Sequence, residues 1–165
     1  MQTAYFAGGC FWCMEAIFQR VEGVIGLVSG YSNGETENPT YEEICSGTTG
    51  HAEVLKIDFD ESLVSYDDLL AVFVEVHDPT SLNRQGEDIG VQYRSAVFYT
   101  DTSQQELAEL LFSGVTGAVT EISPLKVFYP AEDHHQDYYN NNQNQPYCRL
   151  VILPKIQKYF KVNTK

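Results

Sequence analysis

Cys10 is the residue best suited to covalent chemistry. It lies in the segment Gly8–Cys13 (GGCFWC), between a stretch typical of a strand and one typical of a helix. The first N–H groups of a helix and its macrodipole favour negative charge, so a thiol at this turn is expected to ionise to the reactive thiolate. Phe11 and Trp12 would form an apolar wall beside it, suited to a methyl or thioether group. On these residues alone, a nucleophilic thiol and an inert thiol in an aromatic core are equally well supported.

Cys13 follows Cys10 by three residues, one turn of a helix. A C-x-x-C redox pair is one interpretation of this spacing. Thioredoxin-like motifs usually hold small residues or proline between the two cysteines, whereas Phe11 and Trp12 stand there in this chain. A cysteine that packs on its own helix is the other interpretation, and both stay open.

Glu53 follows a glycine-rich turn at residues 46–50 and shares one face of an apolar strand with His51, two residues earlier. A carboxyl group that is desolvated there would have a raised pKa and could stay protonated as a general acid. The alternative is a solvent-facing glutamate on an alternating strand, which composition alone favours.

The chain is acidic: 23 Asp and Glu residues against 10 Lys and Arg residues leave a formal charge of −13. Nucleic acids and anionic membranes are therefore unsuitable partners, because binding them requires clustered basic side chains. The carboxylates are spread along the chain, which indicates a solvated surface. No apolar run approaches the ~20 residues that span a bilayer, and the first residues lack the features of a signal peptide. We expect a soluble, cytoplasmic protein.

The cysteines and histidines do not indicate structural crosslinks. At 165 residues the chain can form one domain, residues 1–165, and bury a core without disulfides. Without a secretion signal, its four cysteines are expected to be catalytic, metal-binding or buried. No metal site is expected, because no zinc-binding spacing is present at the four histidines, which are His51, His77, His134 and His135.

Apolar periodicity predicts four strands and three helices that position these side chains. The strands are residues 3–7, 26–31, 52–59 and 95–100, and the helices are residues 13–21, 66–76 and 103–112. Their order lacks strict βαβ alternation, which indicates an α+β fold. A polar stretch of 17 residues, 77–93, is expected to be a functional loop because of its length. A further helix is expected around residues 134–135, and a polar loop at 140–146.

Five segments carry a family resemblance. Residues 9–13 (GCFWC), 38–41 (NPTY), 45–53 (CSGTTGHAE), 77–95 and 128–138 resemble, in this order, the signatures of the methionine sulfoxide reductase A family. Together they cover nearly the whole chain. The resemblance implies a single catalytic domain with a central mixed sheet and flanking helices, an α/β sandwich of ferredoxin-like character.

The resemblance also implies a reaction, the reduction of methionine-S-sulfoxide, protein-bound or free, to methionine. Cys10 matches the nucleophile that attacks the sulfoxide sulfur and becomes a sulfenic acid, and Glu53 matches the acid that protonates the oxygen. Tyr41 and Tyr93 match phenols that hydrogen-bond that oxygen. The residues that the resemblance assigns to substrate binding are Phe11, Trp12, Asp88 and Tyr138.

The resemblance further implies that a second thiol condenses with the sulfenic acid before an external reductant, thioredoxin or another thiol, restores the protein. Family members commonly use a cysteine in the C-terminal tail, and Cys148 matches that place, without the usual Gly-Tyr-Cys context or a further cysteine beyond it. Cys13 is the local alternative, although two helical residues one turn apart must partly unwind to form a disulfide. Cys148 is favoured, and Cys45 is expected to be a buried structural thiol. We expect no bound cofactor and a monomer.

Two other functions stay open from the residues alone. A general dithiol–disulfide oxidoreductase would use Cys10 and Cys13 and would reduce protein disulfides without any sulfoxide. A non-enzymatic module would bind a metal ion or methionine without turnover.

Overall fold

The sheet at the centre of the fold has six strands in the order β7-β6-β1-β3-β2-β8. The computed structural model describes residues 1–163, so the last two residues of the expected domain lie outside this range. Neighbouring strands are antiparallel except β6 and β7, which are parallel, so the sheet is mixed. The strand bounds are Gln2–Ala7 (β1), Val24–Ser32 (β2), Ala52–Phe59 (β3), Ala96–Tyr99 (β6), Glu121–Pro124 (β7) and Phe128–Pro130 (β8).

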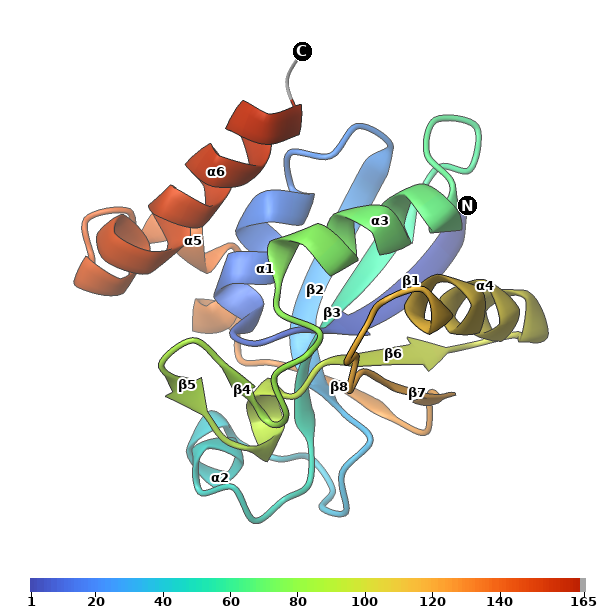
Figure 1. Cartoon of the computed structure of the whole chain (residues 1–165). Helices are drawn as coiled ribbons and strands as arrows, with labels where there is room; N and C mark the ends of the chain where they lie inside the picture. Colours follow the sequence, from blue (N-terminus) through green and yellow to red (C-terminus); the bar gives the residue numbers. More distant parts are fainter. Residues whose placement is uncertain (164–165) are drawn as a thin grey trace.

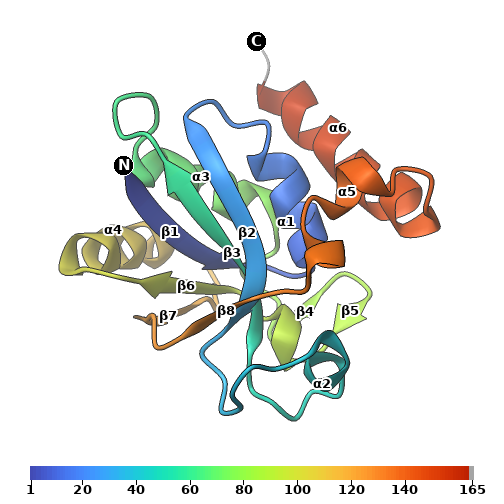
Figure 2. The ribbon, with the colours of Figure 1, turned by 180° about the vertical axis from the view of Figure 1, so that it is seen from behind.

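The longer helices flank this sheet (Figure 1). Three of them lie together on one face and the fourth lies beside β6, and their bounds are Phe11–Phe18 (α1), Tyr66–Val76 (α3), Leu153–Asn163 (α6) and Thr102–Ser113 (α4). The main core lies between these helices and the sheet, where Phe6 of β1 stacks on Phe73 of α3 with ring centroids 4.8 Å apart. Figure 2 shows the opposite face, with β2 nearest the viewer. The expected mixed sheet with flanking helices is confirmed.

Local chemistry explains the elements that periodicity located best. Ser65 caps α3: its hydroxyl accepts the N–H of Asp68, and the Asp68 carboxylate accepts the N–H of Ser65. Leu69, Leu70 and Phe73 form the apolar face of this helix and are fully buried. The predicted helix 66–76 and strand 52–59 coincide with α3 and β3.

Other elements differ from the prediction. Helix α1 begins at Phe11 rather than at residue 13, because Cys10 is the extended residue that caps it. The expected helix around residues 134–135 is a single 3₁₀ turn, η2 (Asp133–His135). The elements that periodicity missed are α2 (Tyr41–Cys45), β4 (Arg84–Gln85), β5 (Asp88–Ile89), η1 (Val91–Tyr93), α5 (Tyr138–Asn141), η3 (Cys148–Ile152), α6, β7 and β8.

The pairing of β1 with β3 brings the chemistry-bearing segments together. Phe6 pairs with Leu55 in an antiparallel register, so the end of β1 and the start of β3 lie at the same edge. Glu53, at the start of β3, is therefore close to the turn that leads from β1 into Cys10. Helix α2 and the hairpin β4–β5 lie at this same end of the molecule in Figures 1 and 2.

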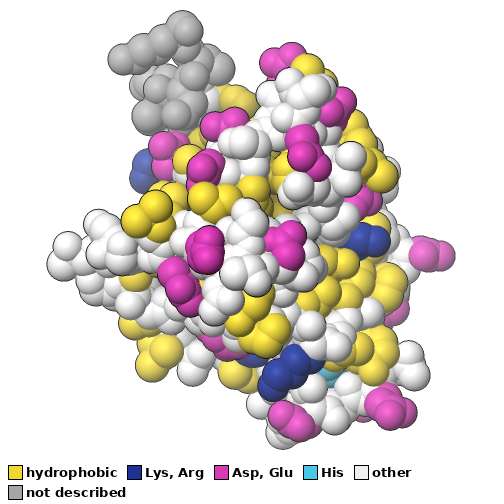
Figure 3. All heavy atoms as spheres, turned by 90° about the vertical axis from the view of Figure 1, so that its right-hand side faces the viewer, with side chains coloured by type: hydrophobic (Ala, Val, Ile, Leu, Met, Phe, Trp, Pro, Cys, Tyr) yellow, Lys and Arg dark blue, Asp and Glu magenta, His cyan; other side chains and the backbone are white. Residues whose placement is uncertain are grey.

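The surface follows the charge pattern of the sequence. On the face shown in Figure 3, Asp and Glu side chains are scattered among uncharged and hydrophobic ones, with few Lys and Arg side chains. The carboxylates are spread over this face, as in a solvated acidic surface. Among residues 1–163, every helix is too short or too polar to cross a bilayer.

Candidate active site

Cys10 occupies the turn between β1 and α1. Its backbone is extended, with φ −62° and ψ 124°, and its carbonyl oxygen accepts the N–H of Cys13 at 3.1 Å. Gly9 makes the turn with φ +88°, and a Cβ there would lie 2.8 Å from Cγ of Gln85, so a larger residue does not fit. Cys10 itself is 9% exposed, which leaves a small part of the residue open to a ligand.

Glu53 lies beside this turn and is 2% exposed. Its Oε1 atom accepts the N–H of Phe11 at 3.1 Å, and within the described residues its Oε2 atom has no hydrogen-bond partner. Burial raises the pKa of Glu53 to about 8, although the bond from Phe11 acts in the opposite direction. The carboxyl is therefore protonated at neutral pH and can donate a proton. The alternative of a solvent-facing glutamate is wrong.

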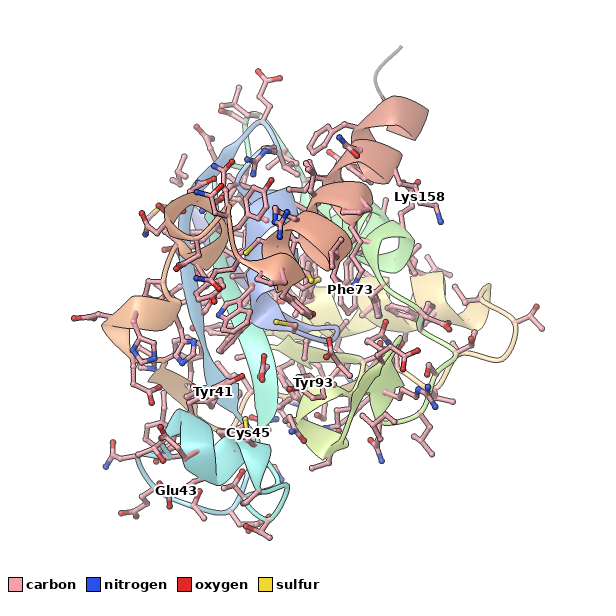
Figure 4. All side chains as sticks on the ribbon, turned by 90° about the vertical axis from the view of Figure 1, so that its left-hand side faces the viewer. Tyr41, Glu43, Cys45, Phe73, Tyr93 and Lys158 are labelled. Atoms are coloured by element: carbon pink, nitrogen blue, oxygen red, sulfur yellow. The ribbon has the colours of Figure 1, made fainter. Side chains whose placement is uncertain are left out.

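Two phenols face the same carboxyl. Tyr41, from α2, and Tyr93, from η1, interact electrostatically with each other and with Glu53, and Figure 4 shows them in one region of the molecule. Burial raises the pKa of both tyrosines well above the ordinary value, and the negative charge of Glu53 would raise it further. Both hydroxyls therefore stay protonated and can donate hydrogen bonds.

Cys45 differs from its prediction as a buried structural thiol. It is exposed at the end of α2, and its thiol is hydrogen-bonded to the hydroxyl of Tyr41 (Figure 4). The prediction is wrong because α2 has only five residues and turns Ile44, rather than Cys45, into the core.

Trp12 forms one wall of the site and Phe11 supports it from behind. The indole stacks on the ring of Tyr138, with centroids 3.7 Å apart and an interplanar angle of 9°. Its Nε1–H donates to Nδ1 of His135 at 3.2 Å. Phe11 is 1% exposed and packs against Tyr31, so it belongs to the core rather than to the open surface.

Two glutamates, Glu15, which is buried, and Glu132, which is half-buried, hold this wall in place, and sequence reasoning missed both roles. Glu15 accepts the N–H groups of Asp137 and Tyr138 at 3.0 and 3.3 Å, which fixes the Tyr138 ring over Trp12. Glu132 accepts the hydroxyl of Tyr31, and the N–H of the first residue of α2, at 3.0 Å each. Nothing in the residue pattern indicates these partners, because each lies about a hundred residues from the group it binds.

Asp88 lies in β5 and interacts electrostatically with Cys13. It accepts the hydroxyl of Tyr147 at 2.8 Å, and that same hydroxyl lies 3.7 Å from Sγ of Cys13. The contact joins the hairpin β4–β5 to the C-terminal segment. Tyr147 was another residue that the sequence analysis did not assign.

The pKa values of the two neighbouring thiols, Cys10 and Cys13, favour ionisation of Cys13, whereas the sequence predicted an ionised Cys10. Burial raises the pKa of Cys10 well above the ordinary value, so the expectation of an ionised Cys10 is wrong for the unliganded protein. The hydrogen bond from Cys10 lowers the pKa of Cys13 to about 7 despite its burial, with further help from Lys155 and Tyr147. Since Cys10 is an extended cap residue, a Cys10–Cys13 disulfide does not require the helix to unwind. Cys148 is fully buried in η3 and interacts electrostatically with Cys13.

Comparison with known proteins identifies the family. A family model described as peptide methionine sulfoxide reductase matches residues 2–165. The chain belongs to the peptide methionine sulfoxide reductase family. A "Peptide methionine sulfoxide reductase MsrA" from Ruthia magnifica subsp. Calyptogena magnifica is 58% identical, covering 97% of this chain and 99% of that protein. One from Saccharolobus solfataricus is 51% identical, covering 98% and 94%.

Solved structures of the peptide methionine sulfoxide reductase family share the fold. Methionine sulfoxide reductase A of Corynebacterium diphtheriae is 37% identical, with a TM-score of 0.78, over 86% of this chain and 74% of that chain. Mxr1 from Saccharomyces cerevisiae in reduced form is 31% identical, with a TM-score of 0.82, over 89% and 88%. The predicted family and its activity, the reduction of methionine sulfoxide, are therefore confirmed.

Proposed function

We propose that this chain reduces methionine-S-sulfoxide by attack of the Cys10 sulfur on the sulfoxide sulfur, with Glu53 as the acid. A sulfoxide sulfur is a poor electrophile because its oxygen would otherwise leave as an oxyanion. The observation that carries the proposal is the buried, protonated carboxyl of Glu53, bonded to the N–H of the residue next to Cys10. Its second oxygen, which has no partner among residues 1–163, can present the proton to the substrate.

The remaining residues would hold the substrate around this pair. Tyr41 and Tyr93 donate hydrogen bonds to the sulfoxide oxygen, and Trp12 with Tyr138 encloses the methyl group. Phe11 supports that wall, and Asp88 supplies polar lining. Because oxygen, methyl and chain are each held by different groups, one sulfoxide epimer fits, which we assign as S.

The first half-reaction oxidises Cys10 by two electrons. The Cys10 sulfur bonds to the sulfoxide sulfur while Glu53 gives its proton to the oxygen. The oxygen then passes to Cys10, methionine leaves as the thioether, and the thiol proton of Cys10 replaces the one that Glu53 gave up. The products are methionine and a Cys10 sulfenic acid.

Cys13 is the resolving thiol that the geometry favours. It already shares a hydrogen bond with Cys10, whereas Cys148 interacts electrostatically with Cys13. Attack of Cys13 on the sulfenic acid forms a disulfide and releases water. We therefore assign the resolving role to Cys13 instead of Cys148, which the sequence favoured, and keep Cys148 as the second candidate.

Thioredoxin, or another dithiol, would then reduce the disulfide by thiol exchange. Mxr1 from Saccharomyces cerevisiae has been solved in complex with Trx2; that chain is 22% identical to this one, with a TM-score of 0.57. The proposed reaction requires no bound cofactor, because the two thiols supply both of the electrons that reduce the sulfoxide.

Several broader expectations belong to the same proposal. Residues 1–165 would act as one catalytic domain, as a monomer in the cytoplasm, on protein-bound and free methionine sulfoxide. The label of a ferredoxin-like sandwich is supported by the order β6-β1-β3-β2, in which neighbouring strands are antiparallel.

One equivalent of methionine-S-sulfoxide, added without reductant, tests the proposal. We expect about one equivalent of methionine and a Cys10–Cys13 disulfide by mass spectrometry of peptides, and neither product from the R epimer. Reduction of insulin at a comparable rate without any sulfoxide would instead support a general dithiol–disulfide oxidoreductase. The general oxidoreductase is not favoured, because its reaction gives the protonated Glu53 no catalytic role.

A further inference from the structure

The C-terminal helix places a cation against the second thiol. Nζ of Lys155, in α6, lies 3.8 Å from Sγ of Cys13, and the two residues are separated by 142 positions in the sequence. We propose that Lys155 is the positioning residue that holds the sulfur of Cys13 as an anion ready to attack the oxidised Cys10. The inference rests on the proposed function and assigns the group that activates its second step.

The surroundings of Cys13 are otherwise acidic or neutral. The groups that interact with it, on every packed element, are Cys10, Glu53, Asp88, Tyr147, Cys148 and Lys155. Lys155 is the one cation among these. A negative sulfur at this buried place would be repelled by Asp88, whereas Glu53 is protonated and neutral at neutral pH. The hydrogen bond from Cys10, the ammonium of Lys155 and the hydrogen bond with Tyr147 offset both burial and this repulsion.

The fold sets the position of this ammonium. Ile152 and Ile156 flank Lys155 along the chain and are buried in the main core, where α6 packs against α1 and α3. Lys155 itself is half-buried, on the wall of a cavity of about 620 Å³ between these helices and the hairpin β4–β5. Lys158 lines the same cavity one turn later and is exposed, with its side chain directed outward in Figure 4. The two lysines therefore offer a matched pair for comparison.

The step that Lys155 would assist is balanced without any further reactant. The Cys13 thiolate forms a bond to the sulfur of the Cys10 sulfenic acid, and the S–O bond breaks. The oxygen leaves as water after taking one proton from Glu53, which regains it from solvent. Cys13 and Cys10 end as a disulfide, and Lys155 keeps its proton throughout.

The experiment compares Lys155→Met with the control Lys158→Met in single-turnover mixing with methionine-S-sulfoxide. We expect both variants to form the first methionine at the rate of the unmodified protein. In Lys155→Met, disulfide formation slows by about 5-fold at pH 7 and its midpoint moves up by about one pH unit, because less Cys13 is ionised. Dimedone, which traps sulfenic acids, labels Cys10 more fully in that variant. Lys155→Arg restores the charge and most of the rate.

The possible results separate this inference from the proposed function. An unchanged disulfide rate and pH midpoint in Lys155→Met overturns the role of Lys155, while methionine formation still supports the function. Equal slowing in Lys158→Met also overturns it, because the effect is then one of general surface charge. If the unmodified protein forms no methionine, the proposed function fails first. Should Lys155→Met not fold, Lys155→Gln is measured in the same way and decides by the same criteria.

Discussion

Glu53 accepts the N–H of Phe11, the residue directly after Cys10, at 3.1 Å. This single bond connects the start of β3 to the first turn of α1, and it engages one of the two carboxyl oxygens. The other oxygen remains within the site. The proton donor and the nucleophile are therefore held in a fixed relationship before any substrate binds, which reduces the reorganisation needed during the reaction.

Glu53→Gln should slow the first turnover by about 100-fold, because general acid catalysis typically contributes 10²–10⁴-fold. The amide can still accept the N–H of Phe11, so the fold and the position of Cys10 should be retained. Rapid mixing with methionine-S-sulfoxide and quantification of methionine measures the rate.

The pH profile is the control for this substitution. Burial raises the pKa of Glu53 to about 8, and the protonated form is the active one, so the unmodified rate should fall as pH rises through about 8. In Glu53→Gln this fall should disappear. A variant that keeps both the full rate and the fall above pH 8 would show that another group supplies the proton.

The same carboxyl makes a prediction about stability. Its pKa is about 8 in the folded protein and near the ordinary value of 4.5 when unfolded, so the folded state binds the proton more tightly. The free energy of unfolding should therefore decrease as pH rises from about 4.5 to about 8. Glu53→Gln removes this loss, so the variant should gain stability relative to the unmodified protein across that interval. Denaturant unfolding at pH 5 and pH 9 checks it, and a stability difference that does not change with pH contradicts it.

Tyr138→Leu should raise KM for methionine sulfoxide by about 3- to 10-fold, since stacked aromatic pairs contribute ~0.5–1.5 kcal/mol. The reason is that the ring of Tyr138 stacks on the ring of Trp12, with centroids 3.7 Å apart, and holds it in place. The first-turnover rate at saturating substrate should change little. Tyr99→Leu, in β6, serves as the control, and an equal KM in both variants would argue against a substrate wall at Trp12.

Cys13→Ser should still form one equivalent of methionine but leave Cys10 as a sulfenic acid, because the hydrogen-bonded partner thiol is gone. Cys148→Ser should form the Cys10–Cys13 disulfide normally. Peptide mapping after one turnover distinguishes them. A disulfide between Cys10 and Cys148 in the unmodified protein would return the resolving role to the tail.

Sequence reasoning reached much of the fold because local signals are strong where they succeed. Ser65 and Asp68 form a capping box, and the apolar spacing behind them locates α3 completely. Helix α6 was missed, although Ile156 and Phe160 lie four residues apart along it and Ile152, four residues before Ile156, ends η3 directly in front of it. The family segments identify Cys10, Glu53 and the two site tyrosines from the sequence alone.

The ionisation of the two thiols could not be predicted in the same way. It depends on burial of Cys10 and on Tyr147 and Lys155, which lie 134 and 142 residues from Cys13 in sequence. A helix N-terminus alone suggested a charged Cys10, yet desolvation outweighs it. The hydrogen bond between the two thiols and the packing of the C-terminal segment together decide which thiol carries the charge.

The yield of methionine from Cys10→Ser tests the central claim most directly. The unmodified protein, mixed with excess methionine-S-sulfoxide and dithiothreitol, should turn over continuously, whereas Cys10→Ser should produce no methionine above background while keeping its fold. Sustained turnover by Cys10→Ser at the unmodified rate would contradict the account, because the sulfur that accepts the oxygen would then lie elsewhere.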